Sequence, residues 1–371
     1  MNDLPHREVP LWKPPRIDRA AALDGFATLL DSGRLRAGYR TAELESQIGE
    51  FFDRPAVAVG SGMDALELLL EAFGVRDRRV LIPAHAFQAI PALVVRLGGH
   101  PVPVPIDPAG LAPQPGILER AGRRALVIWI HHTGIAARHA RATIEALRAR
   151  GATVIEDGAY LLPTDPDGPG TWGDAALLSF APTKPMSATG GAAVITRTQE
   201  IADLIWVRRT HSGVEGRWAE GDVLLRNRSP AETDALLATA QWQQRDRTAQ
   251  RLQDVQHAYT EALLKHRPEL LPDGRDPQPT WGRYLVDLGD RISAQVRPAL
   301  SAHGIATSVT AARPWADYPA LAPYRSLRET PDLQPLLDRT LALPYHPALS
   351  PEDVQHVAER LLEALDHQEK S

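Results

Sequence analysis

The stretch Ser179-Phe180-Ala181-Pro182-Thr183-Lys184-Pro185-Met186-Ser187-Ala188-Thr189-Gly190-Gly191 decides the fold. Apolar runs at 175–180 and 192–196 flank it, so we expect two strands joined by this loop. Pro185 disfavours helical backbone at the residue before it, which predicts extended backbone at Lys184. Loops held between strands often carry reactive groups, whereas most lysines are solvated surface charges. From this stretch alone, Lys184 can be either a reactive group or a solvated surface charge.

The chain before this loop alternates short apolar runs with longer amphipathic ones. The runs predict strands at 56–59, 79–82, 101–104, 125–130 and 152–155. The segments between them predict helices at 63–73, 87–97, 114–121 and 136–150. This alternation indicates an α/β fold with a large, mainly parallel, doubly wound sheet. Ligands bind such sheets beyond the carboxyl ends of the strands, so those loops are the candidate site.

The two ends of the chain differ from this pattern. Residues 1–40 read as an arm and a helix (17–30), and a second helix is predicted at 41–52. Long helical segments follow at 199–209 and 230–265, and the proline-rich segment 268–279 marks a boundary. Beyond it we expect a strand (283–288), a helix (291–303), a strand (305–310) and a final helix from Ser350-Pro351. The predicted division is therefore an arm (1–40), a large domain (41–266) and a small α+β domain (267–371).

Composition excludes several classes of function. A net charge of -5 and a pI near 6.2 give no basic surface for nucleic acid. The chain has no cysteine, which excludes disulfides, thiolate metal sites and cysteine nucleophiles. Apolar runs such as 125–130 are far shorter than the roughly 18 residues of a membrane helix. Residues 1–16 lack the apolar core of a signal peptide, so we expect a cytoplasmic protein.

A glycine turn follows the first strand of the predicted sheet. Gly60-Ser61-Gly62 precedes the helix that begins near Met63. Free N–H groups at a helix start favour a phosphate, and glycines allow it to approach. A plain helix cap, with Ser61 as the N-cap residue, accounts for the same residues.

Two adjacent acids, Glu156 and Asp157, end another apolar strand, and burying them is costly unless each has a partner. Asp157 could hold a protonated ring nitrogen at the ligand edge of the sheet, or it could cap the next turn. A metal site is not expected here, because His131 and His132 are neighbours on extended backbone, where successive side chains point apart.

Lys184, Asp157 and the glycine turn together match the needs of pyridoxal phosphate. This cofactor requires a lysine for a Schiff base, an acid for its ring nitrogen, and hydroxyl and N–H groups for its phosphate. The ring withdraws electrons strongly only while its nitrogen is protonated, so the acid controls the chemistry.

The sequence also resembles a known family, the DegT/StrS-type sugar aminotransferases, which are fold type I pyridoxal-phosphate enzymes related to aspartate aminotransferase. The resemblance runs from about residue 20 to the end and is densest between Val57 and Thr196. It rests on Gly38, Glu45, Ser61-Gly62, Ala65-Leu66, Pro83, Phe87, Glu156-Asp157-Gly158-Ala159, Ser179-Phe180, Thr183-Lys184 and Gly190-Gly191. It implies a large sheet domain and a small C-terminal domain.

The resemblance implies a role for each of several residues. Lys184 would form the Schiff base with the cofactor and shuttle the proton, and Asp157 would pair with the ring nitrogen. Ser179 would bind the phosphate together with the backbone at Gly62 and Met63.

Two further positions bear on the cofactor and on assembly. The resemblance implies that Phe87 stacks on the cofactor ring. Asn227 precedes Gln241 by the family's interval, and in relatives this asparagine reaches the phosphate held by the partner subunit. The resemblance therefore implies a homodimer with shared active sites.

The sequence departs from the family at three positions. Met63 stands where the family usually has threonine, which removes a hydroxyl near the phosphate. Tyr160 replaces a glutamine that contacts the cofactor's phenolic oxygen, and its hydroxyl can donate to that oxygen as well. Ser229 replaces an arginine, with Arg226 and Arg228 beside it.

The expected function is therefore the transfer of an amino group from an amino acid, such as glutamate or glutamine, to a keto sugar or cyclitol. A nucleotide-linked sugar is the favoured acceptor, in antibiotic or surface-sugar biosynthesis. The alternatives are a dehydratase or lyase reaction and a catalytically idle, regulatory cofactor-binding protein. Dehydratase relatives replace the lysine with histidine, whereas Lys184 is present here.

Overall fold

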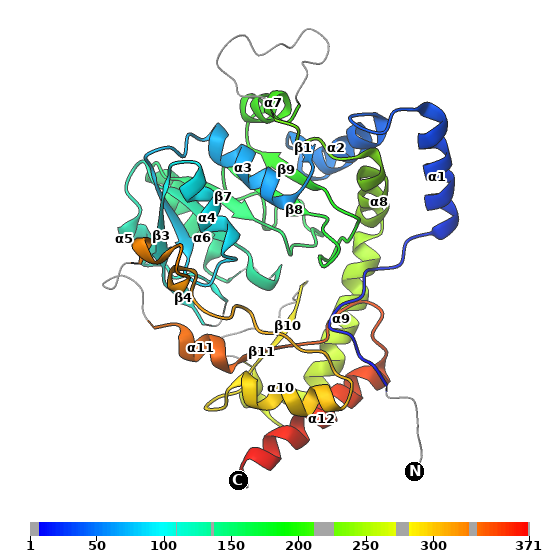
Figure 1. Ribbon diagram of the computed structural model, residues 1–371, viewed down its shortest axis with the longest axis vertical. Helices are drawn as coiled ribbons and strands as arrows, with labels where there is room; N and C mark the ends of the chain where they lie inside the picture. The colour runs from blue at the N-terminus through cyan, green and yellow to red at the C-terminus, as the bar shows by residue number, and fades with distance from the viewer. Residues whose placement is uncertain are drawn as a thin grey trace.

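The computed structural model describes residues 7–108, 110–134, 137–210, 226–271, 282–325 and 332–369. Most of the proline-rich segment 268–279 lies outside these ranges. A seven-stranded sheet forms the centre, with the strand order β1-β9-β8-β7-β6-β2-β3 (Figure 1). Its strands are β1 (Ala56–Val59), β2 (Arg79–Pro83), β3 (His100–Val104), β6 (Leu126–Ile130), β7 (Thr153–Asp157), β8 (Ala175–Ser179) and β9 (Ala192–Thr196).

The sheet is mixed but mainly parallel, as predicted. Strands β3, β2, β6, β7 and β8 pair in parallel, and β9 is antiparallel to both its neighbours, β8 and β1. The carboxyl ends of β1, β2, β6, β7 and β8 therefore meet at one edge. The loops that the sequence singled out are gathered there.

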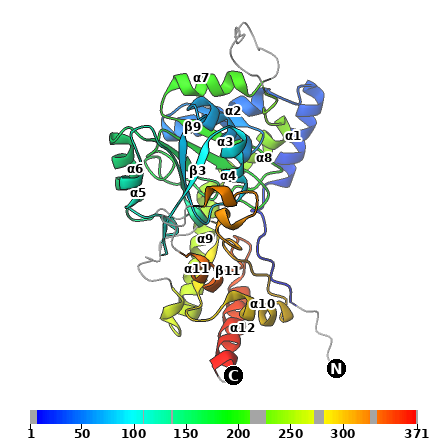
Figure 2. The same ribbon diagram turned by 60° about the vertical axis from the view of Figure 1, so that its left-hand side comes forward.

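Helices cover both faces of the sheet, because side chains alternate along each strand. Helices α3 (Gly62–Ala72), α4 (Ala89–Arg96) and α7 (Gln199–Arg208) pack on one face. The other face is covered by α2 (Tyr39–Phe52) and α8 (Glu232–Gln243) near β1, and by α5 (Ile117–Arg120) and α6 (Ala140–Ala149) near β7. Figure 2 shows α5 and α6 on the side of the sheet opposite α3 and α4.

A second, smaller group of elements lies below the sheet in Figure 1. Strands β10 (Tyr284–Asp287) and β11 (Thr340–Leu343) pair antiparallel, and α10 (Ser293–Ala302), α11 (Gln334–Arg339) and α12 (Pro351–Glu369) surround them. Helix α9 (Arg245–Tyr259) packs against α12 and so connects the two groups. The predicted boundary near residue 266 falls just after the π-helical turn at Thr260–Leu264, and the exact division stays a prediction.

Three predicted elements differ from the structure. The helix expected at 114–121 is only the short α5, and the long helix expected at 230–265 is divided at Gln244 between α8 and α9. The strand expected at 305–310 does not form, because Ile305 and Ser308 make only single bridges, to Val9 and Ala342. Beyond these, α1 (Arg19–Ser32) precedes α2, and β4 (Ile106–Asp107) pairs with β5 (Ala112–Pro113). None of the described helices is both long and apolar enough to span a membrane.

A buried carboxylate joins α8 to the start of α2. Glu232 is fully buried and accepts hydrogen bonds from the amides of Gly38 (2.9 Å), Arg40 (2.8 Å) and Thr41 (3.2 Å). These are orphan N–H groups at a helix start, which a negative charge stabilises. A Cβ at Gly38 would lie 2.7 Å from a Glu232 oxygen, so this contact requires glycine.

Replacing Glu232 with glutamine should lower the free energy of unfolding by about 2 kcal/mol, because a neutral amide turns one N–H₂ group toward backbone donors. Denaturant unfolding of the purified protein measures this change. The matched control is Glu43→Gln on α2, since Glu43 makes solvent-accessible contacts with the side chains of Arg40 and Gln47 and should change stability little. Equal effects of the two variants would contradict the role assigned to Glu232.

Candidate active site

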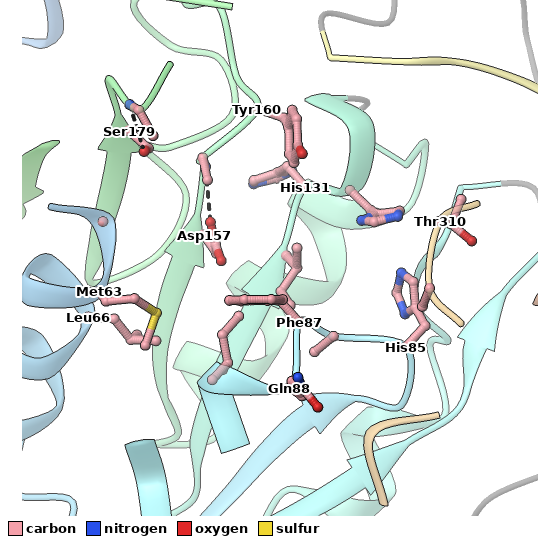
Figure 3. A pocket seen from close by; sticks show the side chains of 18 of the residues that line it. Met63, Leu66, His85, Phe87, Gln88, His131, Asp157, Tyr160, Ser179 and Thr310 are labelled. Carbon is pink, nitrogen blue, oxygen red and sulfur yellow. Dashed lines mark hydrogen bonds between the residues drawn. The ribbon is translucent and has the colours of Figure 1, made fainter. Parts of the chain in front are cut away.

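A cavity of about 580 Å³ opens at the edge where the strands end (Figure 3). Loops after β1, β2, β6, β7 and β8 line it, together with Arg283 and the segment around Thr310 and Arg313. Seven of the eight residues selected from the sequence lie in its wall: Gly62, Met63, Phe87, Asp157, Tyr160, Ser179 and Lys184. The eighth, Asn227, is not among the residues that line it.

One end of the cavity is formed by the start of α3. Ser61 is the N-cap residue, and its Oγ accepts a hydrogen bond from the amide of Asp64 at 3.1 Å. The interpretation of Ser61 as a helix cap is therefore confirmed. A Cβ at Gly62 would lie 3.4 Å from Ser179 Oγ, so the helix start and the end of β8 lie side by side. This end presents backbone N–H groups and a hydroxyl to the cavity.

Asp157 is a buried carboxyl group in the floor of the cavity. Its Oδ1 accepts a hydrogen bond from the amide of Ala159 at 3.0 Å, so it caps the following turn as well as lining the cavity. Burial raises its pKa, and the hydrogen bond from Ala159 and the charges of Lys184 and His131 only partly oppose this. A cationic N–H group in the cavity would favour the ionised form.

Glu156 points the other way from Asp157. Its carboxylate accepts from the amides of Gly170 (2.9 Å) and Gly173 (2.6 Å) and lies 2.7 Å from His131 Nε2. Burial alone would raise the pKa of Glu156, but these hydrogen bonds and the His131 charge outweigh it and lower the pKa. Both acids predicted to need partners have them.

The side chain of Lys184 lies against an aromatic ring. Lys184 is at the end of a turn, where its amide donates to Ala181 O at 2.9 Å, so it is not in a helix. Its Nζ lies 3.5 Å from the centroid of the Tyr160 ring, and Arg283 Nη2 donates to the Tyr160 hydroxyl at 3.2 Å. Burial raises the pKa of Tyr160, but the positive charges of Lys184 and Arg283 outweigh burial and lower the pKa.

Phe87 and Asn227 lie at more open positions. The Phe87 side chain is 67% exposed although it lines the cavity, so one face of its ring is accessible. Asn227 accepts a hydrogen bond through Oδ1 from Arg36, in the segment between α1 and α2. Its neighbours Arg226 and Arg228 pair with acids of α3, the latter with Asp64 at 3.0 Å.

Sequence reasoning missed several residues in the cavity wall. His85 follows β2 and is 2% exposed, and its ring lies edge-on to His132 with centroids 4.5 Å apart. Burial lowers the pKa of His85 to about 4. Its place after a predicted strand was the available signal. Arg283 and Thr310 carried no such signal, because they come from the smaller group of elements.

His131 and His132 point to different places, as the alternation predicts. His131 bonds to Glu156, whereas His132 packs on His85. No cluster of three or more metal-ligating side chains occurs among the described residues.

The residues present fit pyridoxal phosphate. The cavity volume is within the range of about 300–1,000 Å³ usual for cofactor sites. The space beside Gly62, which a Cβ would fill, gives an anion access to the start of α3 and to Ser179. A buried carboxyl at Asp157 and an amine at Lys184 line the same cavity. These are the four groups that the cofactor requires.

Comparison with known proteins supports this fit. The family model described as the DegT/DnrJ/EryC1/StrS aminotransferase family matches residues 17–362. The chain is 30% identical over 356 residues to a pleiotropic regulatory protein of Geobacillus stearothermophilus, covering 91% of this chain and 93% of the relative. It is 26% identical over 377 residues to the dTDP-4-dehydro-2,3,6-trideoxy-D-glucose 4-aminotransferase of Saccharopolyspora spinosa, covering 93% and 94%.

The fold has the same relatives. A putative sugar aminotransferase from Streptococcus pneumoniae, solved in its PMP-form, matches with a TM-score of 0.86 at 19% identity. The match covers 98% of this chain and 100% of that chain. The shared fold is that of fold type I pyridoxal-phosphate enzymes, as the sequence predicted.

The burial of His85 should make the folded protein less stable at acidic pH. An unfolded histidine takes up a proton below its ordinary pKa of 6.5, whereas the folded one stays neutral down to about pH 4. His85 therefore contributes a loss of stability that grows as the pH falls from about 6.5 to about 4, reaching about 3 kcal/mol. Denaturant unfolding across this range should show a smaller loss for His85→Phe than for the wild type. Parallel pH profiles for the two proteins would contradict it.

Proposed function

This chain belongs to the DegT/DnrJ/EryC1/StrS aminotransferase family, and we propose that it transfers an amino group from an amino acid to the keto group of a sugar or cyclitol. It is a pyridoxal-phosphate-dependent aminotransferase and so takes an amino donor and a keto acceptor. The observation that carries the proposal is that Lys184, Asp157 and the start of α3 face one cavity. The sugar acceptor is proposed from the name of the S. spinosa relative.

We propose which residues bind the phosphate, the ring nitrogen and the ring face of the cofactor. The amides of Gly62 and Met63 and the Ser179 hydroxyl would bind its phosphate. The Asp157 carboxylate would accept the N–H of its ring nitrogen, and the exposed face of Phe87 would stack on its ring. When bound, pyridoxal phosphate supplies an electron-withdrawing ring that takes up the electron pair of a broken C–H bond. Asp157 sustains that property by favouring the protonated ring nitrogen.

Lys184 is proposed to attach the cofactor and to move the proton. In its free amine form Nζ can take a proton from the donor carbon and return it at the acceptor carbon. Tyr160 and Arg283 act on this lysine, because the Tyr160 ring attracts its ammonium form while the nearby guanidinium repels it. The Tyr160 hydroxyl would also donate to the cofactor's phenolic oxygen.

A regulatory protein without transferase activity is the second candidate. It is favoured by the name of the Geobacillus relative and by Met63, Tyr160 and Ser229, which differ from the family pattern. Tyr160 nevertheless keeps a hydroxyl within the cavity, and Lys184 is present. A dehydratase reaction is less well supported, since relatives of that type lack the lysine.

The proposal includes a homodimer with shared active sites. Large apolar side chains are exposed in and after α1, at Leu23, Leu30, Leu35 and Tyr39, which is typical of an interaction surface. Asn227 is bonded to Arg36 of the same segment and does not line its own cavity. It would instead reach the cofactor phosphate of the partner subunit. We also propose that the enzyme acts in the cytoplasm, as expected from the sequence.

Replacing Lys184 with alanine should abolish transamination, a loss of at least about 10³-fold, because covalent attachment and proton transfer both need its amine. The purified wild type should be yellow and lose this colour on addition of glutamate, whereas the variant should not respond. Borohydride reduction should attach the cofactor to the peptide that contains Lys184. Lys13 and Lys265 lie outside the cavity, so their alanine variants serve as controls.

Failure of this test has two distinct forms. A wild-type protein that stays colourless after incubation with the cofactor would contradict cofactor binding. A yellow protein that responds to no amino donor would favour the regulatory alternative.

The shared site can be tested by mixing two defective subunits. Lys184→Ala should be inactive, and Asn227→Ala should bind the cofactor more weakly. Coexpressed heterodimers should be more active than either parent, since one of their two sites combines an intact Lys184 with an intact Asn227 from the other subunit. If each subunit used its own Asn227, no activity would be recovered. Light scattering of the wild type gives the oligomeric state directly.

A further inference from the structure

We propose that His85 and Thr310 form a subsite for ring hydroxyl groups of the keto acceptor. The enzyme would then select an acceptor that keeps hydroxyl groups near its keto carbon over a deoxygenated one. This inference rests on the proposed function, because it concerns the substrate of the same cavity.

The two residues lie away from the end proposed for the phosphate. In Figure 3, Met63 and Ser179 are on one side of the cavity and His85 and Thr310 on the other, with Asp157, Phe87 and Tyr160 between them. The amine of Lys184, on the Tyr160 ring, lies in this middle region. A substrate that extends from this amine to that other side would contact His85 and Thr310.

Both residues carry buried polar atoms without a partner. His85 is 2% exposed, and neither Nδ1 nor Nε2 has a hydrogen-bond partner in the described part of the chain. The Thr310 Oγ1 is likewise buried and unbonded there. A buried polar atom without a partner destabilises the protein. Two polar side chains facing one cavity without partners indicate groups that are satisfied by a ligand.

The chemistry of the pair favours hydroxyl groups. Burial holds the His85 pKa at about 4, so the imidazole is neutral at physiological pH and offers one N–H donor and one nitrogen acceptor. The Thr310 hydroxyl also both donates and accepts. A hydroxyl group of the substrate can do the same, so it matches either partner. A neutral imidazole therefore suits a sugar or cyclitol ring.

Carboxylate and phosphate groups have better partners elsewhere in the cavity. The guanidinium groups of Arg283 and Arg313 line it and carry the positive charge that such anions prefer.

His132 packs its ring edge-on against His85 and so fixes the plane of the His85 imidazole.

The experiment compares variants that remove or keep the hydrogen-bonding groups. His85→Phe and Thr310→Val remove them, whereas His85→Asn and Thr310→Ser keep a donor and an acceptor. His100→Phe, at an exposed histidine of β3, is the control substitution. The hydroxylated probes are dTDP-4-dehydro-6-deoxy-D-glucose and scyllo-inosose, and the deoxygenated probe is dTDP-4-dehydro-2,3,6-trideoxy-D-glucose.

Two measurements are made on the holoenzyme. The first is kcat/KM for return of the yellow colour when each acceptor is added to enzyme that glutamate has bleached. The wild type should prefer a hydroxylated probe, and His85→Phe and Thr310→Val should each lower kcat/KM for it by about tenfold or more. For the deoxygenated probe the same two substitutions should lower kcat/KM far less. The conservative variants should keep part of the kcat/KM for the hydroxylated probe. The second is the thermal midpoint, which His85→Phe should leave equal or raise, because it removes unpaired buried atoms.

Several outcomes would overturn the subsite. The subsite is contradicted if the wild type has its highest kcat/KM for the trideoxy probe or uses no hydroxylated probe. It is also contradicted if His85→Phe and Thr310→Val lower kcat/KM equally for all probes. A lower thermal midpoint in both apolar variants would make His85 and Thr310 structural. Bleaching by glutamate tests the proposed function separately, since it needs no acceptor. If glutamate does not bleach the wild type, the proposed function is refuted. If it does bleach the wild type and one of the outcomes above is found, only the subsite is refuted.

Discussion

The site depends on the alternation of two acids at the end of β7. Glu156 is fully buried, and His131 at the end of β6 together with two backbone amides supplies its partners. Without them a carboxylate could not be buried there at an acceptable free energy. Because neighbouring side chains of a strand point to opposite sides, fixing Glu156 turns Asp157 toward the cavity. The neighbouring strands β6 and β8 then bring the loops with His132 and Lys184 to the same edge.

The cavity separates three kinds of electrostatic environment. Its first end offers backbone N–H groups and the Ser179 hydroxyl, and these can bind an anion although they carry no full positive charge. In its middle, two cations meet one phenol, because Lys184 and Arg283 both contact Tyr160. Its other end holds the neutral imidazole of His85. The proposed binding of the cofactor phosphate, the proposed proton transfer and the proposed recognition of an uncharged ring would thus take place at separate positions along one wall.

Sequence alone located the parts of the site that follow from strand order. Strands β1 and β9 were predicted at their observed bounds. Asp157 and Lys184 were selected because they follow apolar runs, and Ser179 because it belongs to the same loop as Lys184. Arg283 and Thr310 could not be found in this way, since no local pattern says that the smaller group of elements reaches the cavity. The segment 305–310 looked like a strand because it is rich in β-branched residues. Its pairing is limited to single bridges, which only the tertiary structure determines.

The cations of the cavity are chemically unequal. The sequence contains the lysines Lys13, Lys184, Lys265 and Lys370, and among those that the structure describes only Lys184 lines the cavity. Guanidinium groups such as those of Arg283 and Arg313 remain protonated and do not form Schiff bases with simple aldehydes or ketones at neutral pH. Within the part of the chain that the structure describes, an aldehyde or ketone that enters the cavity therefore meets a single primary amine. An aldehyde reagent that labels amines should consequently modify the wall of this cavity at one position, Lys184.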